Sequence, residues 1–416
     1  MRARTTNQFP AEVFERASQL VFDQEDEHPS RWAAVVSVAE KAGCSPYALH
    51  EWMRGLKRTE SAALDAREDR VAEYFGKYGE LLRQADVARA LESPFVAAVL
   101  EAGHRQLRHA PRTAALIADW PGDPASSAMA MRFNAALHAL AQRNALPELS
   151  ALYRDRKGDF DSAIGAALTA EDAFIAEWMQ VPPQTNEVGR AATLLSALMV
   201  VHGETGGLPF ELLEIGSSSG LNLNLAYYSY DMGGILAGMQ DSPVRIAPKW
   251  LGPPPPFAPV ELVDTRGVDL QPLDPSDEAV RERLLSYIWA DEPARAERLQ
   301  QALNMALRYP PQVERDNAVH WLDMQLREPQ PAGRCRVVFH SMVLQYLNTD
   351  DRRAVTDTIM AAGARATAAQ PFAWVSFEWS AMRSEVQLML TLWPNGGETR
   401  QLATCHPYGR WINWLG

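Results

Sequence analysis

The stretch Leu208-Pro-Phe-Glu-Leu-Leu-Glu-Ile-Gly-Ser-Ser-Ser-Gly-Leu-Asn222 decides the predicted fold. An apolar run reaches an acid, Glu214, and then passes through two glycines four residues apart. This order predicts a buried strand, a tight turn and the start of a helix, which is how a doubly wound sheet builds a nucleotide site. Gly216 lets the backbone leave the strand, Gly220 lets the helix begin close to the sheet, and Glu214 offers acceptor oxygens to a ribose.

A turn of this kind is equally often a simple change of chain direction, so two interpretations stand side by side. Phosphate-binding turns space their glycines as Gly-x-Gly-x-x-Gly, whereas three serines separate Gly216 from Gly220 here. We therefore expect a cofactor site that lacks an evident pyrophosphate cradle.

From Gln184 onward the pattern alternates between strands and segments long enough for crossover helices. This order predicts an α/β fold with a largely parallel, doubly wound sheet. Four prolines at 253–256 predict a stiff extended loop, which is either a lid over a pocket or a surface connector. The strands are expected at residues 209–215, 260–264, 335–341 and 372–378.

Two further regions precede the α/β part. Residues 60–183 are rich in alanine and carry apolar residues at helical spacing, which predicts an all-α cap domain ahead of an α/β domain over residues 184–416. The histidines within the helical region show no metal-ligand spacing, and no metal is expected. Residues 1–58 read as helix, glycine-bearing turn and helix, with Ser45-Pro46 opening the second helix.

The first 58 residues also resemble the small DNA-binding subunit of insertion-sequence transposases. The resemblance rests on Arg4-Thr-Thr-Asn-Gln-Phe-Pro, Glu27-His-Pro-Ser-Arg-Trp and Gly43-Cys-Ser-Pro-Tyr-Ala-Leu-His-Glu-Trp. It implies that Tyr47, His50 and Arg54 lie nearest the DNA groove. Residues 1–60 hold eight Lys or Arg and nine Asp or Glu, so DNA binding is expected to be weak or vestigial. A small helical appendage is the alternative.

Composition narrows the class of partner and the compartment. Forty basic and 52 acidic residues give a net charge of −12, which disfavours general attraction to nucleic acid or to anionic membranes and favours a small-molecule or protein substrate. The three cysteines suggest neither a disulfide framework nor a metal site. No apolar run of about 18 residues occurs, so we expect a cytoplasmic protein.

Polar residues cluster just before and just after the expected strands. In the segment 184–190, either Thr185 or Asn186 is expected to cap a helix, and the remaining groups exceed what capping needs. An acid at the carboxyl end of the second strand, either Asp264 or Asp269, is expected to face the ligand crevice. The residues of 184–190 with a predicted substrate role are Gln184, Asn186, Glu187 and Arg190.

General acid–base groups are expected at the same edge of the sheet. His340 and Glu378 each end an apolar run, and His406 lies in a turn with Tyr408 and Arg410. Their convergence would suit proton transfer near neutral pH. Ser341 beside His340 does not indicate a hydrolase, since the Gly-x-Ser-x-Gly context is missing.

In this order, the motifs resemble a bacterial family of unknown function. They are Gln-Thr-Asn-Glu with a following arginine, Leu-Leu-Glu-Ile-Gly-Ser-Ser-Ser-Gly-Leu-Asn-Leu, Arg-Gly-Val-Asp-Leu, Val-Phe-His-Ser and His-Pro-Tyr-Gly-Arg-Trp, over roughly residues 67–416. More distantly, the glycine turn and strand order resemble class I S-adenosylmethionine-dependent methyltransferases, with a Rossmann-like sheet. Ser218 departs from the middle glycine that many of those enzymes have.

The methyltransferase resemblance implies S-adenosylmethionine as cofactor, with the methyl acceptor left open. It implies cofactor contacts from Glu214, Gly216, Ser218, Gly220, Asn222, Asp264 or Asp269, and Asp316. His340, Glu378 and His406 are the candidates for a base that removes the acceptor's proton, and Tyr346 is expected to contact the substrate. Two alternatives are a non-catalytic DNA-binding regulator with a ligand-sensing α/β domain and a mobile-element fragment fused to an unrelated enzyme. Fold analogy alone does not decide among these.

Overall fold

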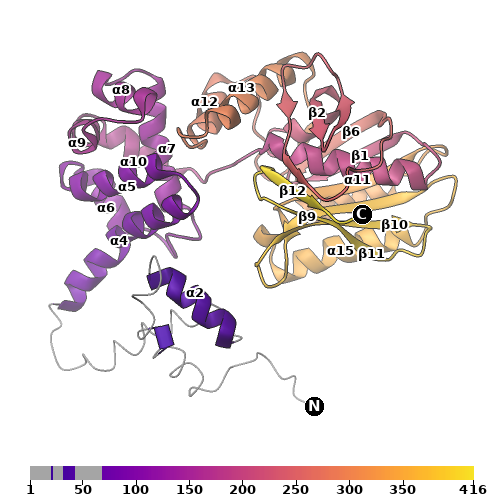
Figure 1. The fold of residues 1–416 in the computed structure, drawn as a ribbon, viewed down its shortest axis with the longest axis horizontal. Coiled ribbons are helices and arrows are strands. Elements are labelled where there is room, and N and C mark those ends of the chain that lie inside the picture. Colours follow the sequence, from indigo (N-terminus) through magenta and orange to yellow (C-terminus); the bar gives the residue numbers. More distant parts are fainter. Residues whose placement is uncertain (1–19, 22–30, 43–67) are drawn as a thin grey trace. The chain divides into compact units, whose positions relative to one another are not determined.

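The computed structural model describes residues 20–21, 31–42 and 68–416 of the chain (Figure 1). Two compact units are present, Met1–Gly76 and Lys77–Gly416. Helix α2 (Arg31–Ala42) of the first unit buries Ala34, Val35, Val38 and Ala39, which lie on one helical face. The DNA-contact residues predicted above, Tyr47, His50 and Arg54, lie outside the described residues.

Every regular element between Glu68 and Gln180 is a helix, as the alanine-rich pattern predicts. Proline occupies the first turn of α5, α6 and α8, where its missing N–H costs nothing. The helices enclose a core that includes Phe133, Leu137 and Ile164. They are α4 (Glu68–Ala90), α5 (Pro94–Gln106), η2 (Leu107–His109), α6 (Pro111–Ala118), α7 (Met129–Gln142), α8 (Pro147–Asp155), α9 (Phe160–Ala170) and α10 (Asp172–Gln180).

The rest of the second unit is built on a nine-stranded, mostly parallel sheet in the order β5-β12-β11-β10-β9-β8-β1-β6-β7. Neighbouring strands from β7 to β9 pair in parallel, those from β9 to β12 pair antiparallel, and β12 pairs in parallel with β5. The bounds are β1 (Phe210–Ile215), β5 (Lys249–Leu251), β6 (Leu262–Asp269), β7 (Val313–Arg315), β8 (Cys335–Ser341), β9 (Phe372–Trp379), β10 (Val386–Trp393), β11 (Thr399–Cys405) and β12 (Trp411–Trp414).

Three of the expected strands are confirmed almost to the residue, as β1, β8 and β9. The expected second strand is too short, because β6 continues five residues past Asp264 to Asp269. The expectation did not include the antiparallel extension or the small sheet that follows β1. That sheet has the order β3-β2-β4 and consists of β2 (Ser229–Met232), β3 (Ile235–Gly238) and β4 (Arg245–Ile246).

Helices cover both faces of the large sheet, with α11 and α15 on opposite sides of it (Figure 1). Successive residues of β1 point to opposite faces of the sheet. Leu212 belongs to the apolar core that includes residues of α11 and α13, and Leu213 belongs to the core that includes residues of α14 and α15. Asparagine caps start α14 and α15. The elements are η3 (Val188–Arg190), α11 (Ala191–Glu204), η4 (Leu221–Tyr227), α12 (Glu278–Ser286), α13 (Pro293–Arg308), α14 (Ala318–Arg327), η5 (Leu344–Tyr346) and α15 (Thr349–Gly363).

The connections reverse direction at β1, which fixes where a ligand would sit. From β1 the chain adds β6 and β7 on one side, and then β8 and β9 on the other. In open α/β sheets, ligands bind outside the carboxyl ends of the strands at such a switch point. Among the described residues, no helix is both long enough and apolar enough to span a bilayer.

Candidate functional site

The turn after β1 is held tightly between neighbouring segments. Gly216 and Gly220 have φ angles of +70° and +71°, so both positions favour glycine. A Cβ atom on Gly216 would lie 2.4 Å from Val343, and one on Gly220 would lie 2.5 Å from Pro311. Ser218, which replaces a glycine of the resembled motif, has φ +55° and thus adopts a conformation unusual for a serine.

The backbone N–H groups of this turn are almost all engaged within the protein. Ser218 donates to Asp269 Oδ2 at 2.9 Å, and Leu221 donates to Asn186 Oδ1 at 3.1 Å. Gly216 and Ser217 donate to Val268 O, and Gly220 donates to Ser217 O. A phosphate group needs such N–H donors free. Few N–H groups of this turn are therefore available to a phosphate.

Residues of the segment 184–190 support the turn from outside. Asn186 donates to Ser217 O at 2.6 Å while accepting from Leu221, and Gln184 bonds Ser218 Oγ and Gln271 O. The predicted capping role of Thr185 or Asn186 is wrong, because Glu187 caps η3 by accepting from Gly189 N. The Asn186 side chain instead holds both ends of the glycine turn, through its hydrogen bonds to Ser217 and Leu221.

Three buried polar atoms beneath the turn lack a hydrogen-bond partner in the described part of the chain: Glu214 Oε2, Ser219 Oγ and Asn222 Oδ1. The three residues are 1–2% exposed. Burial raises the pKa of the Glu214 carboxyl well above its usual range; a hydrogen bond from Asn222 opposes the rise and the nearby Asp269 adds to it. Buried polar groups are normally paired, so unpaired ones indicate a ligand or a proton to be accounted for.

The structure separates the three acids that sequence placed near the cofactor. Asp269 ends β6 and holds Ser218 N and Gln271 N. Asp264 lies within β6 and pairs with Arg266 at 3.1 Å, so its predicted place after the strand is wrong. Asp316 follows β7, donates its N–H to Asp269 O, and contacts His320 Nδ1 at 2.6 Å.

His340 and Glu378 lie in contact at the carboxyl ends of β8 and β9. His340 Nδ1 lies 2.7 Å from Glu378 Oε1, and Trp374 donates to His340 Nε2 at 3.0 Å. These partners place the ring proton on Nδ1 and leave neither nitrogen free. The same Glu378 oxygen accepts from Val343 N and Leu344 N. Burial alone would raise the Glu378 pKa, but these hydrogen bonds outweigh burial and lower it.

His406 does not contact His340; Arg190 joins the two loops instead. Arg190 donates to Ser341 O at 3.1 Å and to Pro407 O at 2.9 Å. His406 Nδ1 accepts from Tyr408 N, so this ring stabilises its own turn. Burial lowers the pKa of His406 to about 4, and nearby Arg410 adds to the effect.

A buried ion-pair network connects this turn with the segment 184–190. Arg295 of α13 contacts Glu187 at 2.5 Å and Glu292 at 2.8 Å, and its guanidinium stacks 4.0 Å above the Tyr408 ring. Burial alone would raise the Glu187 pKa, but Arg295 and Arg298 outweigh burial and lower it. Sequence reasoning missed Arg295 and Trp374, since nothing in their local patterns distinguishes them from ordinary helix and strand residues.

Tyr346, the predicted substrate contact, is 80% exposed in η5.

The predicted catalytic and cofactor residues lie at the carboxyl ends of the sheet strands, except Asp264. They form no common cluster: Glu214, Asp269 and Asn186 gather at the turn, His340 and Glu378 pair beside it, and His406 stands apart. Among the described residues, no group of three or more His, Cys, Asp or Glu side chains is arranged to hold a metal ion.

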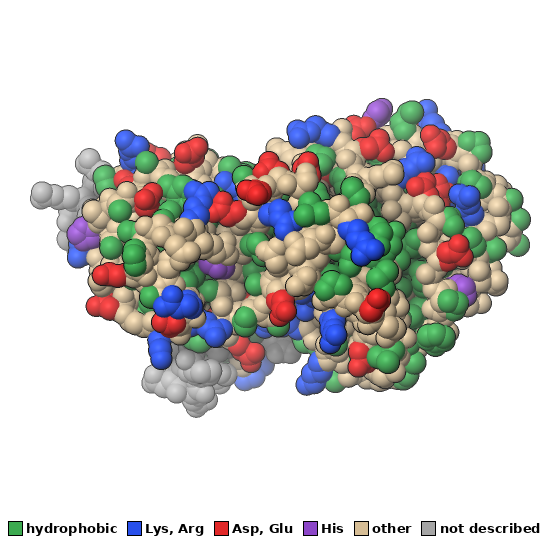
Figure 2. All heavy atoms as spheres, turned by 90° about the horizontal axis from the view of Figure 1, so that it is seen from above, with side chains coloured by type: hydrophobic (Ala, Val, Ile, Leu, Met, Phe, Trp, Pro, Cys, Tyr) green, Lys and Arg blue, Asp and Glu red, His purple; other side chains and the backbone are tan. Residues whose placement is uncertain are grey.

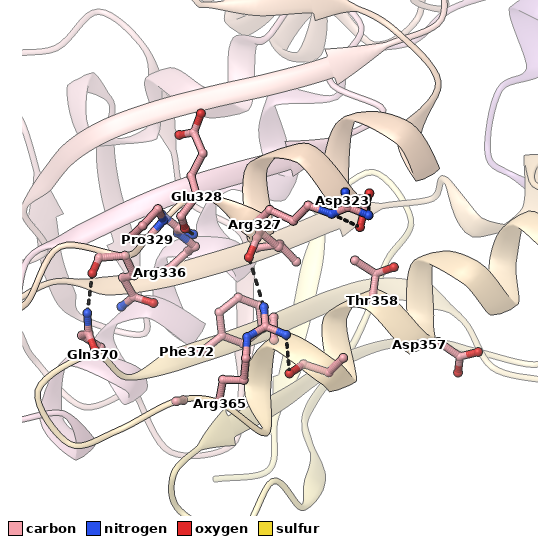
Figure 3. Close-up of a pocket in the computed structure, with 15 residues that line it drawn as sticks. Asp323, Arg327, Glu328, Pro329, Arg336, Asp357, Thr358, Arg365, Gln370 and Phe372 are labelled. Atoms are coloured by element: carbon pink, nitrogen blue, oxygen red, sulfur yellow. Dashed lines mark hydrogen bonds and ion pairs between the residues drawn. The ribbon is translucent and has the colours of Figure 1, made fainter.

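A cavity of about 750 Å³ lies at the amino ends of β8 and β9, between α14 and α15 (Figure 3). Arg336 in its wall is paired with Glu211 through two hydrogen bonds, and Arg327 is paired with Asp323. Arg365 donates to the carbonyls of Ala361 and Leu326. Because these guanidinium groups already have ion-pair or hydrogen-bond partners, the cavity does not share the unsatisfied polar character of the β1 turn.

Charges of both signs are interspersed over the face of the molecule shown in Figure 2. Basic side chains form no continuous patch on this face, where the described residues mix Lys and Arg with Asp and Glu. Such a surface gives little general attraction to polyanions.

Comparison with known proteins gives a family but no activity. The family model described as "Uncharacterized protein conserved in bacteria (DUF2332)" matches residues 79–414. At its N-terminal end the chain is 31% identical over 94 residues to the insertion element IS629 uncharacterized 12 kDa protein of Shigella flexneri and to that of Shigella sonnei. That match covers 22% of this chain and 87% of each relative. No solved structure matches the chain significantly.

Proposed function

We propose that this chain, which belongs to the family of uncharacterized proteins conserved in bacteria (DUF2332), is an S-adenosylmethionine-dependent methyltransferase whose cofactor binds at the turn after β1. The strand order β7-β6-β1-β8-β9 supports the proposal, because it matches the 3-2-1-4-5 part of the doubly wound sheets that bind nucleotides at the switch point.

The observation that carries the proposal is the set of unpaired polar atoms of Glu214, Ser219 and Asn222. A carboxyl, a hydroxyl and an amide oxygen suit a ligand that brings hydroxyl or ammonium donors. Most N–H groups of the turn are engaged within the protein, which disfavours phosphate, and S-adenosylmethionine has ribose hydroxyls, an ammonium group and a sulfonium but no phosphate. Glu214, Asp269 and Asn222 are the residues that would hold it.

When bound, this cofactor supplies an electrophilic methyl group, and the protein's main task is to align an acceptor with it. His340 has both ring nitrogens occupied, so we assign it, with Trp374, to holding Glu378 in place. Glu378 uses Oε1 for its described hydrogen bonds, which leaves Oε2 as the oxygen available to an acceptor's proton. Its lowered pKa suits an acceptor whose proton is lost easily.

Isothermal titration of the full chain with S-adenosylmethionine tests the proposal. We expect saturable binding that Asp269→Asn weakens on the order of 10-fold or more, the loss typical of a charged hydrogen bond. Asp264→Asn is the matched control, because this acid lies inside β6 and pairs with Arg266. Absence of binding at millimolar cofactor, or equal effects of the two variants, would contradict the proposal.

The match to an insertion-element protein favours a second candidate, a mobile-element fragment with DNA-binding capacity joined to the α/β part. This candidate predicts salt-sensitive retention of DNA that disappears when residues 1–58 are deleted. Retention that survives the deletion would reject it. Normal cofactor binding by the deleted protein would show that the two functions are separable.

A further inference from the structure

We propose that Glu214 is a neutral carboxylic acid in the ligand-free protein and releases its proton when a ligand enters the β1 turn. The inference rests on the proposed function, because S-adenosylmethionine is the probe for the binding step. It adds a form of regulation: occupancy of the site depends on pH over the range in which Glu214 of the ligand-free protein stays protonated.

The position of Glu214 argues for the neutral form. The residue is 2% exposed, and its Oε2 has no partner within the described residues. An ionised carboxylate in such a place would lose its hydration without gaining a counter-ion. Ser219 Oγ and Asn222 Oδ1, which lie unpaired in the same turn, offer no positive charge.

The charged and titratable groups around Glu214 reinforce this state. Asp269 at the end of β6 has the same sign and repels a second negative charge. Arg190 of η3 is the opposing cation, but its guanidinium is committed to the carbonyls of Ser341 and Pro407. Tyr228, after η4, is buried, and burial raises its pKa, so it stays neutral. Glu214 therefore has no dedicated counter-charge.

A ligand with ammonium or hydroxyl donors changes this balance. Its N–H or O–H groups donate to the carboxyl oxygens and stabilise the ionised form. The O–H bond of Glu214 then breaks, the electron pair stays on the carboxylate, and the proton passes to the buffer. No oxidant or reductant is involved.

Titration calorimetry of the full chain in two buffers of equal pH and different ionisation enthalpy measures the released proton. We expect up to one proton released per S-adenosylmethionine bound, and an affinity that rises up to tenfold per pH unit while Glu214 is protonated in the free protein. Binding with no proton release would overturn the inference and leave the proposed function standing. No binding at all would overturn the proposed function.

Infrared spectroscopy of the ligand-free chain gives an independent test. At neutral pH the carbonyl band of a protonated carboxylic acid should be present and should disappear in Glu214→Gln. Glu187→Gln is the matched control, because Glu187 is equally buried but faces Arg295 and Arg298, and the band should persist. A wild-type spectrum without the band, or loss of the band in the control alone, would refute the neutral state. If a variant fails to fold, the wild-type spectrum alone still tests the inference, because a missing band would refute it.

Discussion

The ion pair between Glu187 and Arg295 provides the sharpest test of how the site is held together. Their side chains are 2% and 8% exposed, and Glu187 Oε2 lies 2.5 Å from Arg295 Nε. Removing one member of a buried pair costs about 3–5 kcal/mol, because the other charge remains buried. Glu292 still contacts Arg295 in Glu187→Gln, so we expect the lower end, about 3 kcal/mol.

Urea unfolding followed by tryptophan fluorescence measures this loss. The matched control is Glu282→Gln, whose partner Arg143 is 45% exposed and which should cost at most about 1 kcal/mol. The Glu187 pKa is lowered in the folded state, so its contribution is present above the unfolded-state value of about 4.3 and is lost as pH falls through the folded value. Equal losses in the two variants, or a gap that widens in acid, would refute the reasoning.

Three further predictions concern the turn and its neighbours. The raised pKa of Glu214 in the folded state means that the wild type loses unfolding free energy as pH rises above about 4.3, by about 1.4 kcal/mol per pH unit until the folded Glu214 ionises. Glu214→Gln lacks this loss, so its stability relative to wild type should increase over the same range. An equal difference between the two proteins in urea unfolding at pH 5 and at pH 6 would refute this. Gly216→Ala should lower the unfolding free energy by more than about 1 kcal/mol, since its Cβ would meet Val343 and its φ is +70°, whereas Gly122→Ala meets only open space at a similar φ. Trp374→Phe should remove the donor to His340 Nε2 and cost about 1 kcal/mol in thermal unfolding, and no change would show that the bond is not formed in solution.

The sequence predicted the strands in which apolar residues predominate. Strands β1, β8 and β9 are mostly apolar, with only isolated polar residues, and glycine, proline or polar residues bound them, so the predicted ends lie close to the observed ones. The predicted second strand is shorter than β6 because Asp264 and Arg266 interrupt the apolar pattern; in the structure the two side chains pair with each other, and Arg266 also donates to Gln325. The alternating pattern of β10 was a usable signal that the prediction omitted.

The candidate site was predicted in outline but not in its contacts. His340 and Glu378 were placed at strand ends, and their contact follows because β8 and β9 are parallel neighbours. The roles of Trp374 and Arg295 depend on which strands and helices become neighbours, and a single sequence does not contain that information. The unpaired atoms of Ser219 and Asn222 likewise emerge only from three-dimensional burial.

The internally saturated backbone of the β1 turn has a practical consequence for ligand discovery. Asp269 and Asn186 already accept hydrogen bonds from two backbone N–H groups that a phosphate would need, so triphosphates and dinucleotides find few free donors there. A screening library for this protein should therefore begin with uncharged and cationic nucleosides, and hits that depend on a phosphate should be sought elsewhere on its surface.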